Sequence, residues 1–351
     1  MGEYREVAFS AQTGLVELLR EVEAAVVEKR RTVVLVLFDG LGTQFLDARV
    51  PVLAAAQKAT LRAPFPTTTT VSLATLATGM TPTAHGIVGH LLWWPEVSRV
   101  INTLKFVDLT GAAVSLDNQA ILPAPNLWER LRAAGCEAVT VQPADFVDTP
   151  LTRTLYRGCR FVGATTSEEF VTATLRAASE AGTFVFTYLP PVDYAAHVFG
   201  VESAEVNEAL AWVSAVWEGL AAGLPARVEL LGTADHGVMP IAEEGKLILR
   251  DPRYRPLEFW GDSRAVMVRG SRRLTRELAD LTGARLVERD EFLPWLGDDP
   301  PHRHLAARLP DAVLLAQPGQ VILPWGFDKR LRGYHGGLDP IEVDIPLLRR
   351  E

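Results

Sequence analysis

One short run of residues limits the folds open to this chain more than any other feature. Residues 33–38, VVLVLF, are continuously apolar and rich in valine, and the run stops at Asp39 and Gly40. A strand without polar alternation must be buried on both faces, which is typical of a parallel sheet covered by helices. The carboxyl end of such a strand is where open α/β sheets bind their ligands. Asp39 is therefore the first candidate site residue.

Helical and strand patterns alternate along most of the chain. Amphipathic or capped helical patterns are expected over residues 11–30, around 45–57, from the threonine run to Met80, and over 126–135, 167–181 and 202–222. Strand patterns are expected over residues 59–63, 136–142, 183–189 and 227–235. This alternation predicts an α/β fold with a mainly parallel central sheet flanked by helices.

The stretch from about 240 to 325 is less regular than the rest. It contains clusters such as DPRYRP and GDDPPHRH. The later segment GYHGGLDPIEVDIPLL carries a motif that belongs with the earlier ones. We therefore expect a single catalytic domain over residues 1–351, with residues 240–325 as an inserted or side subdomain.

Composition excludes several classes of protein. The 35 basic and 43 acidic residues give a net charge of −8, which does not favour a nucleic-acid-binding platform. No apolar run approaches the ~20 residues of a membrane span. The first residues lack the pattern of a signal peptide, so the expected location is the cytoplasm. Cys136 and Cys159 have no metal-finger spacing and are expected to be small apolar core residues.

Three common nucleotide and hydrolase motifs are missing. Gly40 and Gly42 resemble the start of a dinucleotide-binding fingerprint, but Phe45 stands where its third glycine is required. The chain has neither a GxxxxGK[ST] phosphate loop nor a GxSxG nucleophile elbow. A dehydrogenase, a P-loop ATPase and an α/β-hydrolase are therefore disfavoured.

Acidic residues and histidines fall together at the ends of expected strands. PPVDYAAHVFG holds Asp193 and His197, TADHG holds Asp235 and His236, and YHGGL holds His335. Each motif alone also fits a cap, a salt bridge or a tight turn. Their joint occurrence with Asp39 gives three carboxylates and three imidazoles. This ligand mixture is expected for two divalent ions such as zinc.

A threonine run precedes the helix that ends near Met80. In FPTTTTVSLATLATG, a threonine at the helix start lies near the positive end of the helix dipole, which favours a phosphoryl anion. The threonines also fit simple helix caps. A threonine hydroxyl becomes a competent nucleophile when a divalent cation lowers its pKa.

These motifs together resemble the alkaline phosphatase superfamily, and its nucleotide pyrophosphatase/phosphodiesterase branch in particular. The resemblance runs in the family's order through FDGLG, PTTTTVSLATLATG, HGIVG, PPVDYAAHVFG, TADHG and GYHGGL, over residues 33–348. It implies that Thr69, three residues after Pro66, is the nucleophile. It implies one metal at Asp39, Thr69, Asp235 and His236, and a second at Asp193, His197 and His335.

Two positions depart from the family pattern. Ser72 stands where an asparagine often holds a phosphoryl oxygen, and Thr70 stands where an aromatic residue is common. His85 fits a scaffold turn, whereas His90, His302 and His304 match no family role. Trp93 and Trp94 fit either core packing, which we favour, or stacking on a leaving group.

The resemblance implies metal-dependent hydrolysis of phosphate esters through a covalent threonine intermediate. The expected enzyme is a phosphodiesterase or nucleotide pyrophosphatase with two zinc ions, with manganese as the other metal considered. Its expected partner is a small phosphate ester or nucleotide. A phosphomonoesterase or phosphonate hydrolase is the first alternative. A monoesterase needs an extra positive charge, and the sequence has no dedicated residue for it; Lys105 and Arg99 are candidates only by their proximity in the sequence. A noncatalytic sensor of phosphate ligands is the remote alternative.

Overall fold

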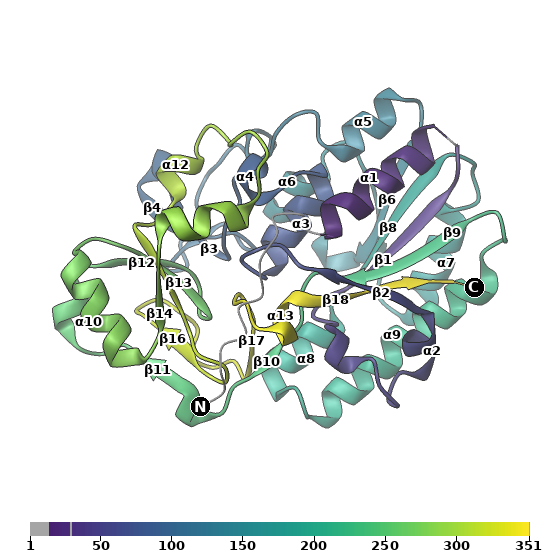
Figure 1. Ribbon diagram of the computed structural model, residues 1–351. Coiled ribbons are helices and arrows are strands. Elements are labelled where there is room, and N and C mark those ends of the chain that lie inside the picture. Colours follow the sequence, from purple (N-terminus) through teal and green to yellow (C-terminus); the bar gives the residue numbers. More distant parts are fainter. Residues whose placement is uncertain (1–13, 29, 351) are drawn as a thin grey trace.

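A seven-stranded sheet forms the centre of the computed structural model, which describes residues 14–28 and 30–350 (Figure 1). The strand order is β2-β18-β9-β1-β8-β6-β7, and only β18 runs antiparallel to its neighbours. The strands are β1 (Val33–Phe38), β2 (Gln57–Arg62), β6 (Glu137–Pro143), β7 (Arg160–Ala164), β8 (Thr183–Leu189), β9 (Glu229–Ala234) and β18 (Asp344–Arg349). The predicted α/β fold with a mainly parallel sheet is confirmed.

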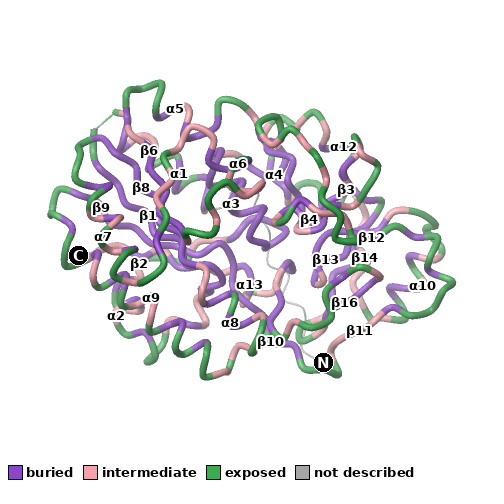
Figure 2. The backbone as a smooth tube through the Cα atoms, turned by 180° about the vertical axis from the view of Figure 1, so that it is seen from behind, coloured by how far each residue is buried: buried purple, intermediate pink, exposed green. Residues whose placement is uncertain are grey.

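Helices cover both faces of this sheet (Figure 1). One layer holds α1 (Gly14–Val27), α3 (Thr69–Thr78) and α5 (Leu127–Ala133); the other holds α2 (Pro51–Ala56), α7 (Ser167–Ala177), α8 (Pro191–Phe199) and α9 (Ala204–Gly223). Residues 11–13 of the first predicted helix lie outside the described residues. All six residues of β1 are fully buried, as its sequence predicts. Figure 2 shows this burial running along the neighbouring strands.

The helix predicted around residues 45–57 is wrong in its extent. Residues 43–45 form one 3-10 turn, and α2 begins only at Pro51. The proline ring disfavours a helical conformation of the preceding residue, and Val50 adopts φ −132° and ψ 58°. Pro51 itself is well suited to the first helical position.

A second, antiparallel sheet stands beside the first. Its order is β14-β15-β13-β12-β3-β4-β5. The strands are β3 (Leu91–Trp94), β4 (Arg99–Asn102), β5 (Val107–Asp108), β12 (Glu258–Asp262), β13 (Ala265–Arg269), β14 (Arg285–Glu288) and β15 (Ala312–Leu315). Most of it comes from the stretch expected to be a side subdomain, but residues 91–108 contribute three strands. The division into a catalytic domain and a side subdomain stays a prediction.

Short elements complete the two lobes. Two small ladders pair β10 (Met239–Pro240) with β17 (Gly333–Tyr334), and β11 (Lys246–Ile248) with β16 (Val321–Leu323). The remaining helices are α4 (Pro82–His85), α6 (Pro150–Leu155), α10 (Arg272–Thr282), α11 (Arg289–Phe292), α12 (Leu305–Arg308) and α13 (Pro340–Val343). Among the described residues, no helix combines the length and apolarity that a bilayer crossing requires.

A buried ion pair joins the two sheets. Arg264, in the turn between β12 and β13, donates from Nη2 to Glu342 Oε2 at 2.8 Å, and Glu342 lies in α13, directly before β18. Arg264 is 2% exposed and Glu342 is fully buried. The Arg264 Nη1 group also donates to the carbonyls of Gln317 and Gln320 at 2.6 and 2.7 Å. Such a pair is expensive to break, because removing one charge leaves the other desolvated.

We expect Glu342→Gln to lower the free energy of unfolding by ~3–5 kcal/mol, because it leaves the Arg264 charge buried without its counter-ion. Urea denaturation measures this loss. The control is Glu288→Gln, which removes the partner of Arg272 in an exposed pair. That change should cost less than about 1 kcal/mol. Equal small losses in both variants would contradict the role given to the buried pair.

Candidate active site and metal centre

Three acidic residues meet at the carboxyl edge of the central sheet. Asp39 directly follows β1, Asp235 directly follows the adjacent β9, and Asp193 lies in the first turn of α8 after β8. The backbone N–H of Asp193 donates to the Asp39 carbonyl at 3.1 Å. Because adjacent parallel strands end at one edge, three positions far apart in the sequence become neighbours.

Gly40 allows this close approach. Its φ of +73° is a conformation that residues with a Cβ rarely adopt, and a Cβ here would lie 2.8 Å from Asp193 Cβ. The Gly40 N–H donates to Asp235 Oδ1 at 2.9 Å, and the His236 N–H donates to the same oxygen at 3.0 Å. The turn after β1 therefore orients the carboxylate that follows β9.

Three histidines turn Nε2 toward these carboxylates and Nδ1 toward the backbone. The Nδ1 atoms of His197, His236 and His335 lie 2.7, 3.1 and 2.9 Å from backbone carbonyl oxygens. A carbonyl can only accept a hydrogen bond, so each Nδ1 carries the proton and donates. In its neutral form, each ring can then present the Nε2 lone pair to the cluster. This is the arrangement of metal-binding histidines whose other nitrogen is fixed by a backbone carbonyl.

The three carboxylates add oxygen ligands to these nitrogen ligands. Asp39 Oδ1, Asp193 Oδ1 and Asp235 Oδ2 are buried and have no hydrogen-bond partner within the described part of the chain. The other Asp39 oxygen, Oδ2, accepts a short hydrogen bond from Tyr188. Buried carboxylate oxygens without donors, facing imidazole lone pairs, fit the donor set of a divalent cation.

Two overlapping groups of donors can be drawn from these atoms. In each group, the ligand atoms lie within 4.8 Å of one another. The first group is Asp193, His197 and His335, and the second is Asp39, Asp193 and His236. Asp235 Oδ2 lies 3.3 Å from His236 Nε2. The sequence associated Asp193 with only one metal, whereas in the structure its carboxylate lies beside both groups.

Thr69 lies next to this cluster. It is the first residue of α3, after the cap position Thr68, and its Oγ1 lies 3.1 Å from His236 Nε2. All ten residues of α3 are buried, so the amino end of the helix points into the interior of the protein. The structure thus brings together all seven residues that the sequence proposed, namely Asp39, Thr69, Asp193, His197, Asp235, His236 and His335.

The crowding of these acids alters their protonation. Burial raises the pKa of Asp39, and the negative charges of Asp235 and Asp193 raise it further. Burial also opposes ionisation of Asp193, but the charge of His197 and the hydrogen bond between these two side chains hold its pKa below the usual value. The Asp193 carboxylate raises the pKa of His197 to about 9 against the effect of burial. In the absence of a cation, a proton on His197 therefore balances part of the acidic charge.

Several other predicted residues lie outside the cluster. The Ser72 hydroxyl donates to the carbonyl of Asp235 at 2.8 Å, so it braces a site residue. His85 is fully buried and its Nε2 lies 3.1 Å from Thr75 Oγ1, as its expected scaffold role requires. Arg99 pairs with Asp108 at 2.9 Å.

The remaining aromatic and histidine candidates belong to the second lobe. The guanidinium groups of Arg269 and Arg308 lie 4.3 and 4.2 Å from the ring centroids of Trp93 and Trp94. Both tryptophans therefore take part in packing around the second sheet, which is the role favoured for them. His304 pairs with Glu96 at 3.2 Å, and the His302 ring lies 5.5 Å from that of His304.

Sequence reasoning missed residues that border the cluster. Tyr188, which donates to Asp39, is one position from the end of β8 and has no motif of its own. His90 was given no role, yet burial and the charges of His197 and Lys105 together lower its pKa to about 4. Its Nε2 lies 3.1 Å from Asn102 Nδ2. The amide nitrogen of Asn102 can only donate, so His90 Nε2 accepts and the neutral His90 ring carries its proton on Nδ1.

Asp262 is a further buried acid near the site. It ends β12, and its Oδ2 accepts a hydrogen bond from the His90 N–H at 3.3 Å. A Cβ on Gly336, the residue after His335, would lie 2.4 Å from Asp262 Cβ. Burial raises the pKa of Asp262 to about 7, although the hydrogen bond from His90 favours the charged form.

Comparisons with known proteins agree with this fold. A sequence model of the type I phosphodiesterase / nucleotide pyrophosphatase family matches residues 33–337. No curated protein sequence is significantly similar to the chain. Among solved structures, murine ectonucleotide pyrophosphatase/phosphodiesterase 5 is similar with 20% identity and a TM-score of 0.67, over 90% of this chain and 87% of that one. An inactive form of that murine protein, with a threonine replaced by alanine, is known in complex with AMP.

A second similar structure is phosphonoacetate hydrolase from Sinorhizobium meliloti in complex with phosphonoacetate. Its identity is 18% and its TM-score is 0.67, over 92% of this chain and 90% of that one. At such identities the likeness to these solved structures concerns the fold.

We expect Asp262→Asn to change the pH dependence of stability. The folded protein favours the neutral acid, so ionisation of Asp262 costs stability as the pH rises from about 4 through about 7. The variant has no carboxyl group at this position and so avoids this loss. Its free energy of unfolding, relative to that of the original protein, should therefore be ~1–3 kcal/mol higher above pH 7 than at pH 4. Denaturation of the chelator-treated proteins across this range measures the difference.

Asp108→Asn is a control of opposite sign. Hydrogen bonds from Thr110 lower the pKa of Asp108, so its stabilising effect is present at neutral pH and is lost as the pH falls. This variant should lose stability at neutral pH. A pH profile of Asp262→Asn that parallels the original profile would contradict the buried, neutral acid.

Proposed function

The chain belongs to the type I phosphodiesterase / nucleotide pyrophosphatase family and is a phosphoric ester hydrolase, and we propose that it acts on phosphodiesters or nucleotide pyrophosphates through Thr69. One observation carries the proposal: Thr69 Oγ1, at the start of a buried helix, lies 3.1 Å from His236 Nε2 within a cluster of six carboxylate and imidazole side chains. A hydroxyl at this position has the surroundings that a nucleophile toward phosphorus requires.

Two divalent cations are proposed for the cluster. Asp39, Asp235 and His236 would hold one, together with the Thr69 oxygen; Asp193, His197 and His335 would hold the other. Three imidazole nitrogens among six donors favour zinc over manganese. When bound, such cations stabilise negative charge on a phosphoryl group and on the attacking and leaving oxygens.

The proposed reaction begins at the Thr69 hydroxyl. Attack by Oγ1 on phosphorus forms a threonine–phosphorus ester and breaks the bond to the leaving oxygen, which keeps the electron pair. The hydroxyl proton passes to solvent. Water then attacks the same phosphorus and the bond from phosphorus to Oγ1 breaks. Oγ1 takes up the proton that the water loses, which restores the Thr69 hydroxyl and releases the phosphorylated product. The amino end of α3 favours the negative charge that develops beside it. The murine relative, inactive when a threonine is replaced by alanine, supports such a role for threonine.

A diester substrate suits the charges near Thr69. A phosphomonoester brings one more negative charge than a diester, and needs another cationic group to balance it. Of the two cations considered, Arg99 is paired with Asp108, and Lys105 is exposed. The Lys105 charge is nevertheless felt at His90, and the Sinorhizobium meliloti relative binds phosphonoacetate. Phosphonate or phosphomonoester hydrolysis is therefore the second candidate.

We expect Thr69→Ala to lower kcat for bis-p-nitrophenyl phosphate at least about 10³-fold, because it removes the nucleophile. Release of p-nitrophenol measures the rate, with p-nitrophenyl phosphate as the monoester comparison. Faster diester cleavage supports the phosphodiesterase, and faster monoester cleavage supports the second candidate.

Thr70→Ala is the matched control for the nucleophile. The Thr70 hydroxyl lies on the next residue of α3, but it accepts a hydrogen bond from Thr103 at 2.9 Å instead of facing His236. This variant should retain most of the activity. Full activity in Thr69→Ala would contradict the covalent mechanism, and no metal-dependent turnover of any ester would favour the sensor.

We expect His335→Ala to weaken zinc binding by more than about 100-fold, since changes to groups that merely support a ligand already cost 10–100-fold. Competition with a chromogenic chelator measures the affinity without reference to activity. His304→Ala is the control, because His304 pairs with Glu96 on the second lobe. Unchanged zinc stoichiometry and affinity in His335→Ala would exclude His335 as a ligand.

A further inference from the structure

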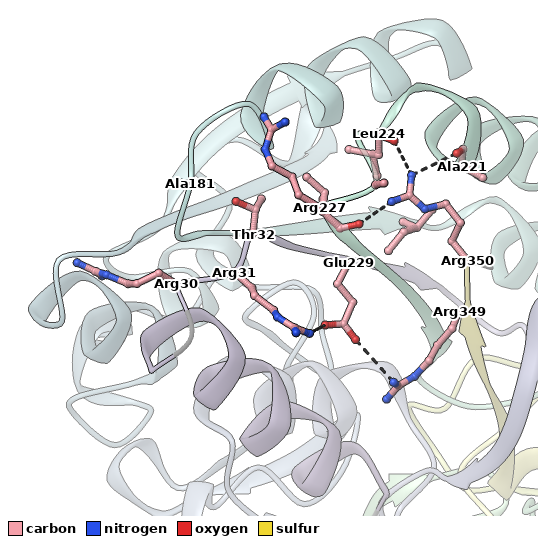
Figure 3. Close-up of a pocket in the computed structure, with 13 residues that line it drawn as sticks. Arg30, Arg31, Thr32, Ala181, Ala221, Leu224, Arg227, Glu229, Arg349 and Arg350 are labelled. Carbon is pink, nitrogen blue, oxygen red and sulfur yellow. Dashed lines mark hydrogen bonds and ion pairs between the residues drawn. The ribbon is translucent and has the colours of Figure 1, made fainter.

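A cavity of about 870 Å³ opens at the edge of the central sheet opposite the metal centre (Figure 3). It is lined by Arg30–Thr32 before β1, by the turn before β9, and by Arg349 and Arg350 at the end of β18. Strands β1 and β9 each have six residues, so ~20 Å of strand separates this edge from the acidic one. A ligand here would not compete for space with a substrate at Thr69.

The cavity is strongly basic. Five of its thirteen lining residues are arginines and only one, Glu229, is acidic, although the chain as a whole carries a net charge of −8. The arginines are Arg30, Arg31, Arg227, Arg349 and Arg350. Such a concentration of one sign in a concave surface raises the local concentration of anions.

Backbone carbonyls fix one of these arginines firmly. Arg350 Nη1 donates to the carbonyl of Leu224 at 2.6 Å, and Nη2 donates to the carbonyl of Val228 at 2.6 Å (Figure 3). No carboxylate among the described residues pairs with Arg350, so its positive charge is met only by carbonyl dipoles. A fixed cation of this kind needs no reorganisation to attract an anion.

The other arginines keep donors for a ligand. Arg31 Nη1 and Arg349 Nη1 lie 4.0 and 3.7 Å from the two oxygens of Glu229, which is too long for hydrogen bonds. Arg349 Nη2 donates a long hydrogen bond of 3.5 Å to Glu21 Oε2, so its Nη1 group is the one left for a ligand. Arg227 has no hydrogen-bond or ion-pair partner within residues 14–28 and 30–350. A second cavity, of about 300 Å³, adjoins the first and shares Arg31, Glu229 and Arg349.

Part of the wall is apolar. Ala181, Leu224, Ala226 and Leu230 contribute to the lining between the arginines. The volume lies in the range of 300–1,000 Å³ that is typical of small-molecule sites. The cavity therefore offers charge for an anion and an aliphatic surface for an uncharged group.

We propose that this cavity binds a small phosphorylated molecule of the nucleoside monophosphate class, at a site separate from the metal centre. Guanidinium groups match phosphate oxygens by paired N–H donors, and Arg31, Arg227 and Arg349 supply them. The base and sugar have apolar faces for the aliphatic wall. Their amino and hydroxyl groups can donate hydrogen bonds to the Glu229 carboxylate while the phosphate group binds the guanidinium groups, whereas inorganic phosphate has no second polar part to do so.

AMP binding to chelator-treated protein tests this site independently of catalysis. Equilibrium dialysis at low ionic strength should show saturable binding of AMP, at least about tenfold tighter than binding of inorganic phosphate or of adenosine. The double variant Arg227→Gln/Arg349→Gln should weaken AMP binding at least about tenfold. Arg227→Gln alone, which alters an exposed side chain, should weaken it several-fold without disturbing the fold.

The matched control is Arg272→Gln/Arg276→Gln. These arginines flank Glu288 on the second lobe as Arg31 and Arg349 flank Glu229, and the change in net charge is the same. This control should change AMP affinity less than twofold. Equal weakening in both double variants, unchanged binding in the cavity variants, or no AMP binding by the original protein would overturn the proposal. Affinity for phosphate equal to that for AMP would overturn the assignment to a nucleoside phosphate.

Discussion

Burial of three carboxylates at one edge of the central sheet is the constraint on which the other features of the site depend. Asp39 and Asp235 emerge from adjacent parallel strands, and Asp193 is held against them by the first turn of α8. Removing these charges from water is costly, and their mutual repulsion adds to the cost, as the raised pKa of Asp39 reflects. The surrounding residues therefore have to supply positive charge. A proton on His197 provides some of it, and the donor set has the character that a divalent cation would satisfy more completely.

The second lobe contributes to the site by fixing its loops. The N–H of Gly337, two residues after His335, donates to Glu342 Oε1 at 2.9 Å. The N–H of Gly237, directly after His236, donates to the Glu342 carbonyl at 2.9 Å. Arg264 neutralises Glu342 from the second sheet. One buried glutamate thus connects two histidine-bearing loops to both sheets, so the geometry of the cluster depends on packing far from Thr69.

The sequence predicted the layered α/β fold and the seven residues that the structure brings together, because both have local signals. The run at 33–38 has only one environment open to it, and each metal-site motif keeps its residues within a few positions. Glu342 and Tyr188 had no such signal, since their partners lie 78 and 149 positions away along the chain. The second sheet was equally hard to predict. Its strands are short, and β3 pairs with β12 across more than 150 residues, so the local pattern of apolar residues cannot predict which strands pair.

The two edges of the central sheet differ in charge because of strand direction. Arginines precede β1 and β9, while aspartates follow them, so parallel alignment gathers bases at one edge and acids at the other. Strand β18 alone runs the other way, and it therefore carries the chain from Glu342 near the acidic cluster to Arg349 and Arg350 at the basic edge. Had β18 been parallel, its terminal arginines would lie beside the buried aspartates and would form ion pairs with them. The single antiparallel strand keeps the two sets of charges apart, and this separation gives one sheet an acidic edge and a basic edge at once.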